Sequence, residues 1–288
     1  MCDYSLLTKV FSRAVFSELL EYSCSSTLNE VIQTFIDNPY ENTYGQNIDI
    51  LYKILKKDYR NEYLYKNTLI NKWIYGKYSP TTATALTEIP IGTAKADFIV
   101  INGEATVYEI KTELDNLERL DSQVENYFKV FKYVNIVTCD SKAQILREKY
   151  KDSPVGIKVL TKKLTISDVK SAEEYDAGIQ LDELFNVLRK YEYENIIKNH
   201  YGELPNVSAF HYYEACKRMF MEMDKEHVYR VWIKELKKRM QPDIRVKNIP
   251  EPLKFLSYFC KMRAWEFREL EMFLQSKFKE VEECTTLI

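Results

Sequence analysis

Apolar residues recur every three or four positions through residues 1–57, which predicts a helical N-terminal region. Leu7, Val10 and Phe11 begin the pattern, and turn-forming residues near position 40 interrupt it. We expect this region to form a helical lid or a dimer surface. A further helix is predicted over residues 61–75, and it ends where glycine and proline follow.

After residue 83 the pattern changes to alternating, β-branched strands. Three runs are predicted, at residues 86–91, 96–101 and 105–112, and Asn102-Gly103 lies between the last two. Both residue types tolerate a positive φ, so this dipeptide predicts a hairpin. A helix opened by Asp115 follows, and then come a strand over 133–139, a helix over 142–150 and a strand over 155–161.

The polar stretch that follows Lys163 predicts a linker, and the chain beyond it becomes helical again. A chain of 288 residues is long enough for one core domain with helical additions. We therefore predict three consecutive regions: N-terminal helices over residues 1–57, an α/β core over 58–163, and C-terminal helices over 164–288.

Composition excludes several classes of site. The chain has 41 basic and 43 acidic residues, so no overall basic field indicates a nucleic-acid or membrane partner. Its seven glycines are too widely spaced for a phosphate-binding glycine loop. The six cysteines never reach CxxC spacing, and the three histidines form no HExxH motif, which argues against zinc chemistry.

No apolar run approaches the roughly 20 residues that span a bilayer. The N-terminus carries Asp3, Lys9 and Arg13 inside its apolar pattern, unlike a signal peptide. We therefore expect a cytoplasmic protein without a membrane partner.

The most informative chemical feature is Asp97 on one predicted strand and Glu109-Ile110-Lys111 on the next. Side chains two residues apart on a strand share a face, so Glu109 and Lys111 point together. Two carboxylates that converge from neighbouring strands provide the oxygen ligands that Mg²⁺ prefers. An adjacent ammonium group can orient an attacking water and offset the charge that develops during phosphoryl transfer.

Convergence depends on the hairpin between the two strands. A two-residue turn would pair Asp97 with Tyr108 and place its carboxylate on the wrong face, so an odd-length turn is required. We predict a three-residue turn over Ile101–Gly103, which pairs Val100 with Glu104, or an equivalent bulge. The alternative is an exposed antiparallel sheet face with a cross-strand salt bridge, since the acid-x-lysine pattern also occurs elsewhere in this chain.

These motifs carry a resemblance. Residues 96–100 (ADFIV), residues 107–111 (VYEIK) and the helix with Gln123 resemble the PD-(D/E)XK nuclease superfamily over about residues 60–161. More narrowly, the pattern TE...KAD...YEIK resembles a bacterial and phage-encoded nuclease-like group. Alanine rather than proline precedes Asp97 here. The resemblance implies a restriction-endonuclease-like α/β core (αβββαβ) with a mixed sheet flanked by helices.

The resemblance further implies metal-dependent hydrolysis of phosphodiester bonds, most often in DNA. Asp97 and Glu109 would hold Mg²⁺ or Mn²⁺ together with the carbonyl of Ile110, and Lys111 would position the attacking water. Glu62 matches a helical acid that many members add to the metal ligands. Its alternative role is a carboxylate favoured by the dipole at a helix N-terminus.

Two further residues have similarly divided interpretations. Gln123 matches a glutamine that contacts the site or the nucleic acid, but it is also adjacent to the apolar Val124 and suits a boundary position. Glu88 either supports the metal ligands or contacts substrate, and the alternative is a charge on an edge strand.

Residues 225–268 contain twelve basic and five acidic side chains. They form either a phosphate-binding face that includes Lys237, Lys238 and Arg239 or an ordinary solvated helix surface. The leading hypothesis is a metal-dependent nuclease that acts on DNA in phage or mobile-element conflict. The alternative is a catalytically silent nuclease fold that binds nucleic acid or protein, and the aromatic-rich helices also suit a homodimer.

Overall fold

The computed structural model describes residues 3–241 and 243–279, and it divides the chain into two compact units. One unit is helical and combines residues 1–80 with 242–288, whereas the other contains Thr81–Gln241 and a mixed sheet. This division differs from three consecutive regions, because the two ends of the chain belong to one unit. No described helix combines the length and the apolar character needed to cross a membrane.

The helical unit is built from short helices at both ends of the chain. They are α1 (Leu6–Val10), α2 (Arg13–Tyr22), α3 (Ser26–Phe35), η1 (Pro39–Glu41), α4 (Tyr44–Asp58), α5 (Glu62–Leu69), η2 (Ile70–Lys77), η3 (Ile244–Asn248), η4 (Glu251–Leu253), α12 (Lys254–Phe259) and α13 (Ala264–Gln275). Serine, threonine and asparagine side chains cap α2, α3, α4 and α5.

Asn67 explains why the two ends of the chain belong together. Its side chain is fully buried, and its Oδ1 accepts a 2.9 Å hydrogen bond from the Phe255 amide. Its Nδ2 donates at 2.8 Å to the Tyr52 hydroxyl and to the Glu251 carbonyl. A buried amide needs these partners, so the C-terminal segment completes the core of the N-terminal helices.

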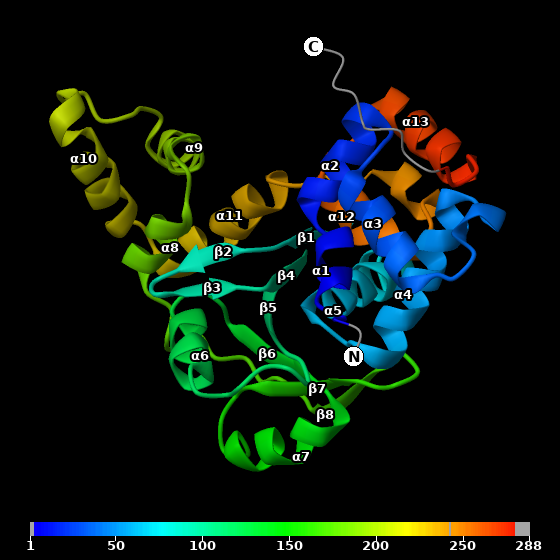
Figure 1. Cartoon of the computed structure of the whole chain (residues 1–288). Helices are drawn as coiled ribbons and strands as arrows, with labels where there is room; N and C mark the ends of the chain where they lie inside the picture. The colour runs from blue at the N-terminus through cyan, green and yellow to red at the C-terminus, as the bar shows by residue number, and fades with distance from the viewer. Residues whose placement is uncertain (1–2, 242, 280–288) are drawn as a thin grey trace. The chain divides into compact units, whose positions relative to one another are not determined.

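The second unit contains a six-stranded sheet in the order β1-β4-β5-β6-β7-β8, so the predicted mixed α/β class is confirmed (Figure 1). The sheet strands are β1 (Thr84–Leu86), β4 (Phe98–Asn102), β5 (Glu104–Lys111), β6 (Tyr133–Thr138), β7 (Gly156–Leu160) and β8 (Ile166–Lys170). β5, β6 and β7 are parallel neighbours, and the other pairs are antiparallel. A separate hairpin joins β2 (Ile89–Ile91) to β3 (Ala94–Ala96).

Two helices connect the parallel strands and flank the sheet. α6 (Leu120–Phe128) packs against β3 and β6, and α7 (Asp140–Lys149) packs against β7 and β8. β6 is buried along nearly its whole length, as expected for a parallel strand covered on both faces.

Several predicted boundaries are wrong for local reasons. α6 begins at Leu120 rather than Asp115, because the Asp115 carboxylate instead accepts hydrogen bonds from the amide and hydroxyl of Thr112. The predicted strand 96–101 is divided at Asp97 into β3 and β4. The predicted linker after Lys163 is wrong over Ile166–Lys170, which form β8.

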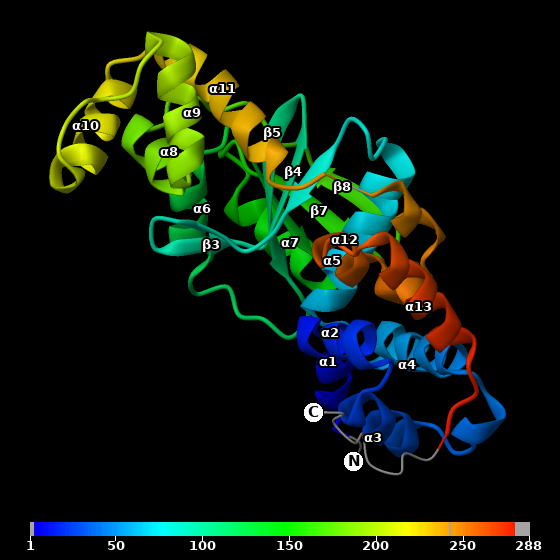
Figure 2. The ribbon, with the colours of Figure 1, turned by 90° about the horizontal axis from the view of Figure 1, so that it is seen from above.

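Four helices complete the α/β unit: α8 (Leu181–Val187), α9 (Lys190–Tyr201), α10 (Ala209–Met221) and α11 (Lys225–Lys238), seen together in Figure 2. A buried ion pair holds α9 to the end of α11, with Arg239 Nη2 2.6 Å from Glu192 Oε2 and Arg239 Nε 2.7 Å from Glu192 Oε1. Burial favours a higher pKa for the Glu192 carboxyl, but hydrogen bonds from Arg239 and the Arg189 amide outweigh it and lower the pKa below its usual value.

We predict that Arg239→Met lowers the free energy of unfolding by about 3–5 kcal/mol, because it leaves the Glu192 carboxylate buried without its partner. Lys151→Met removes an exposed ion pair with Glu148 and should cost less than about 1 kcal/mol. Urea denaturation followed by circular dichroism measures both changes. Equal effects of the two substitutions would contradict this role for the buried pair.

The same pair predicts a pH dependence. Because the Glu192 pKa is lowered on folding, its stabilisation is complete above the unfolded value of about 4.3 and disappears as the pH falls through the folded pKa. The difference in unfolding free energy between wild type and Arg239→Met should therefore shrink when urea titrations are repeated at pH values below about 4. A constant difference down to pH 2 would contradict the assignment.

Candidate active site

The turn between β4 and β5 decides which side chains share a face. Ile101 pairs with Ala105 and Asn102 with Glu104, so the turn has an odd length and Gly103 adopts a positive φ of 83°. The predicted pairing of Val100 with Glu104 is wrong, because the turn is centred one residue further along the chain. The prediction that the turn has an odd number of residues is correct. Continuing the register one residue beyond the pair Phe98 and Tyr108 places Asp97 opposite Glu109.

Asp97 occupies the break between β3 and β4 and is fixed by its backbone and its side chain. The Thr87 hydroxyl donates to its carbonyl oxygen at 2.7 Å, and its Oδ2 accepts a 2.8 Å hydrogen bond from the Ile110 amide. The N–H and C=O groups of one strand residue leave the strand on the same side. The carbonyl of Ile110 is therefore on the side of β5 where Asp97 lies.

Glu109 and Lys111 project from the same face of β5 and contact each other. Lys111 Nζ is 2.8 Å from Glu109 Oε1, and it also donates to Gln123 Oε1 at 3.0 Å. The Glu109 side chain is 1% exposed and the Lys111 side chain 13%, so water screens this ion pair weakly. The structure thus brings together three of the predicted residues: Glu109, Lys111 and Gln123.

Tyr127 adds a fourth member that the sequence analysis missed. Its hydroxyl lies 2.5 Å from Glu109 Oε2 and 3.0 Å from the Lys95 carbonyl oxygen. Burial raises the pKa of Tyr127, and the negative charge of Glu109 raises it further. The phenol therefore stays protonated and donates a hydrogen bond to the Glu109 carboxylate. Gln123 and Tyr127 are four residues apart on α6, and this spacing is the signal that could have identified Tyr127.

α6 also fixes the β2-β3 hairpin. A side chain at Gly92, where φ is 54°, would place its Cβ 2.3 Å from Asn126 Oδ1 on α6. The Asn126 amide donates to the Thr93 hydroxyl at 3.2 Å. One helix therefore positions both Glu109 and the hairpin that leads into Asp97.

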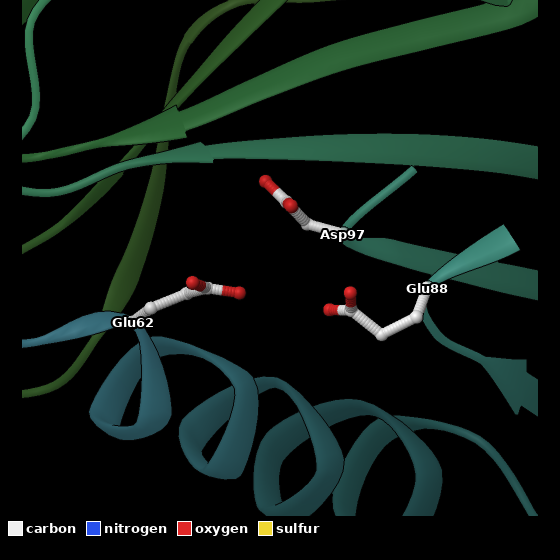
Figure 3. Close-up of side chains that lie close together, drawn as sticks. All are labelled: Glu62, Glu88 and Asp97. Atoms are coloured by element: carbon white, nitrogen blue, oxygen red, sulfur yellow. The ribbon is translucent and has the colours of Figure 1, made fainter. Parts of the chain in front are cut away.

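Glu88, which was predicted either to support the site or to be a charge on an edge strand, lies beside Asp97. A carboxylate oxygen of Glu88 lies within 4.8 Å of one of Asp97, and Figure 3 shows the two side chains on neighbouring segments. Glu88 also ion-pairs with Lys95. Its φ of 58° is unusual for a residue with a Cβ and costs about 1–3 kcal/mol, so the surrounding fold holds it in this conformation.

Glu62 is the first residue of α5 and belongs to the helical unit. Its carboxylate pairs with Lys66 Nζ at 2.5 Å, and its side chain is half exposed. These contacts suit a carboxylate at a helix N-terminus, and its role as a metal ligand stays a prediction.

The three basic residues at the end of α11 have different environments. Arg239 is 6% exposed and bound to Glu192, which gives it a structural role rather than a place on a phosphate-binding surface. Lys238 is exposed and pairs with Glu235, whereas Lys237 donates to the Thr82 carbonyl at 2.7 Å. Lys237 and Lys238 therefore remain the candidates for phosphate contacts.

The donor set in the α/β unit fits a hard divalent cation. Asp97 and Glu88 have carboxylate oxygens within 4.8 Å of each other, Glu109 contributes a carboxylate from the neighbouring strand β5, and the Ile110 carbonyl lies on the side of β5 where Asp97 lies. A carboxylate oxygen has two lone pairs, so Glu109 can accept hydrogen bonds and still bind a metal ion. Three carboxylates and the two ammonium groups of Lys95 and Lys111 leave an excess of negative charge that a cation would neutralise.

The chain is similar to phage proteins. A family model described as bacteriophage P4 protein cII matches residues 55–247. Protein cII of Enterobacteria phage P4 is 33% identical over 88 residues, which cover 30% of this chain and 33% of that protein. The chain thus matches about a third of the length of this curated relative, and no solved structure matches it. The expected link to phage proteins is confirmed, and the chain belongs to the bacteriophage P4 protein cII family.

Proposed function

We propose that this protein is a metal-dependent phosphodiesterase that cleaves nucleic acid, with DNA as the substrate. The observation that carries the proposal is the register of β4 and β5, which places Asp97 opposite Glu109 when it is continued one residue beyond Phe98 and Tyr108, while Lys111 contacts Glu109 from the same face. A cross-strand salt bridge alone would not require the further contacts to Gln123 and Tyr127.

We further propose that the sheet forms a restriction-endonuclease-like core. The antiparallel hairpin β4-β5, the helix α6, and the parallel strand β6 follow one another in the order that the PD-(D/E)XK resemblance implies.

Asp97, Glu109 and the Ile110 carbonyl would hold Mg²⁺ or Mn²⁺, and Glu88 would assist Asp97. The bound cation would polarise the phosphate and favour a hydroxide nucleophile near neutral pH. Asp97 is oriented for this role by the Ile110 amide, which occupies one of its oxygens.

Lys111 would orient the attacking water and offset the charge on the phosphate. An ammonium group has three N–H donors, and Glu109 and Gln123 accept two of them. The third can be donated to the water or to a phosphate oxygen. Gln123 and Glu109 together restrict the rotation of the lysine, so the donor is already aligned when substrate binds.

Cleavage should depend on these side chains. We predict that Asp97→Asn, Glu109→Gln and Lys111→Ala each lower the rate of DNA cleavage in Mg²⁺ by about 10²–10⁴-fold, because each removes a ligand or a donor. Asp168→Asn is the matched control, because Asp168 also lies in an acid-x-lysine pattern but on the exposed edge strand β8. This variant should cleave DNA at the wild-type rate.

Gel assays with single- and double-stranded DNA, with and without EDTA, measure these rates. Metal-independent cleavage, or equal rates for all four variants, would reject the active site. DNA binding that is insensitive to EDTA, without cleavage in any divalent metal, would instead favour the catalytically silent binding module.

Tyr127 should act as a positioning residue for Glu109. We predict that Tyr127→Phe raises the Mg²⁺ concentration for half-maximal cleavage by about 10–100-fold and leaves the KM for DNA unchanged, because the phenol orients a metal ligand. Tyr150→Phe is the matched control. Tyr150 lies at the end of α7, and the substitution removes a similar hydrogen bond from its phenol to the Asp121 carboxylate. If both variants had the same metal dependence as wild type, Tyr127 would have only a structural role.

A further inference from the structure

The helical unit contains a cavity of about 660 Å³ that the proposed active site does not use. The N-terminal end of α4, the segment η3 and one face of α13 line it. Residues 264, 267, 268, 271 and 275 of α13 contribute to the lining, and this spacing is that of a single helix face. A cavity of this size accommodates a small organic ligand rather than a single ion.

Two arginines bring positive charge to this cavity. The guanidinium of Arg245 lies 4.5 Å from the centre of the Phe267 ring and is hydrogen-bonded to the Asp243 carboxylate, so its plane is fixed before any ligand arrives. Arg268 lies on the same lining face of α13, next to Phe267, and forms no ion pair with any described residue. A guanidinium group without a carboxylate partner is a preferred binder of phosphate.

The remaining lining argues against a bare anion. Asp49 and Glu271 place carboxylates in the same cavity, where they would repel sulfate or free phosphate but accept hydrogen bonds from hydroxyl and amino groups. Burial raises the pKa of Asp49, and Lys53 and Lys56 oppose this effect, so water only partly solvates this acceptor. Ile249, Pro250 and Phe267 add apolar contacts.

We propose that this cavity binds a nucleoside 5′-monophosphate, either free or at the end of a nucleic-acid strand. Arg268 would bind the phosphate, and Asp49 would accept hydrogen bonds from the sugar or the base. The base would lie against the apolar lining or on the plane of Arg245, because guanidinium groups and apolar side chains both stack on bases. This proposal does not depend on the nuclease activity.

The test is calorimetric titration of the full-length protein in EDTA with AMP, GMP, CMP and UMP. At least one nucleotide should bind with a Kd below about 1 mM, and the matching nucleoside and inorganic phosphate should each bind at least about tenfold more weakly. Arg268→Ala and Asp49→Asn should each weaken nucleotide binding about tenfold or more, and Arg268→Lys should do so less.

Two control variants test whether the effects are specific to the cavity, and a competing oligonucleotide tests whether strand ends also bind there. Lys247→Ala removes a cation from η3 that does not line the cavity, and Asp97→Asn alters only the proposed nuclease site, so both should bind the nucleotide as wild type does. A short 5′-phosphorylated oligonucleotide that competes with the nucleotide would show that strand ends enter the cavity. An oligonucleotide that does not compete would limit the ligand to free nucleotides.

Absence of saturable binding for all four nucleotides would overturn the proposal. So would binding that Arg268→Ala and Asp49→Asn both leave unchanged, provided that thermal unfolding shows that both variants fold as wild type does. Tighter binding of inorganic phosphate than of any nucleotide would also overturn it, since the carboxylates and the apolar lining would then have no role.

Discussion

The length of the β4-β5 turn is the constraint on which the site depends. Alternate residues of a strand face opposite sides of the sheet, so a change of one residue in the turn would move Asp97 away from Glu109 and Lys111. Gly103 allows the odd-length turn because it adopts a positive φ, and the register then sets Asp97 opposite Glu109. The break in the strand at Asp97 lets its carboxylate accept a hydrogen bond from the Ile110 amide.

Burial of Glu109 imposes the second requirement. A carboxylate with 1% exposure is stable only if its charge and its lone pairs are satisfied, and Lys111 and Tyr127 provide these contacts. α6 holds both partners. Tyr127 is a residue of this helix, and Lys111 donates a hydrogen bond to Gln123 on the same helix. The packing of one helix on the sheet therefore controls the geometry of the acid and of the lysine. Preorganised groups of this kind are typical of sites that stabilise charge during a reaction.

Local sequence patterns predicted the parts of this arrangement that depend on strand alternation and on the turn. The shared face of Glu109 and Lys111 and the odd turn follow from residue spacing, whereas the place of Gln123 was expected only from the family resemblance. Other parts depend on tertiary contacts. Tyr127 belongs to an apolar stripe that is typical of a helix core, and only the structure shows that its hydroxyl reaches Glu109. The left-handed conformation of Glu88 has no sequence signature, since glycine and asparagine usually occupy such positions.

The same limit explains the differences in domain organisation and in the basic segment. Asn67 joins residues almost 190 positions apart, and no local pattern indicates such a contact. Arg239 is one of twelve basic residues in its segment, and its burial against Glu192 becomes visible only once α9 and α11 are packed. Charge counts alone therefore identified candidates for phosphate binding but could not separate an exposed lysine from a buried arginine.

The most direct measurement is the anomalous difference density of crystals soaked in Mn²⁺. We expect a peak within about 2.5 Å of carboxylate oxygens of both Asp97 and Glu109, the range of metal–oxygen bonds, and loss of that peak in Asp97→Asn crystals. A fully soaked crystal with no peak between these two carboxylates, or with Mn²⁺ bound only at other acids, would contradict it.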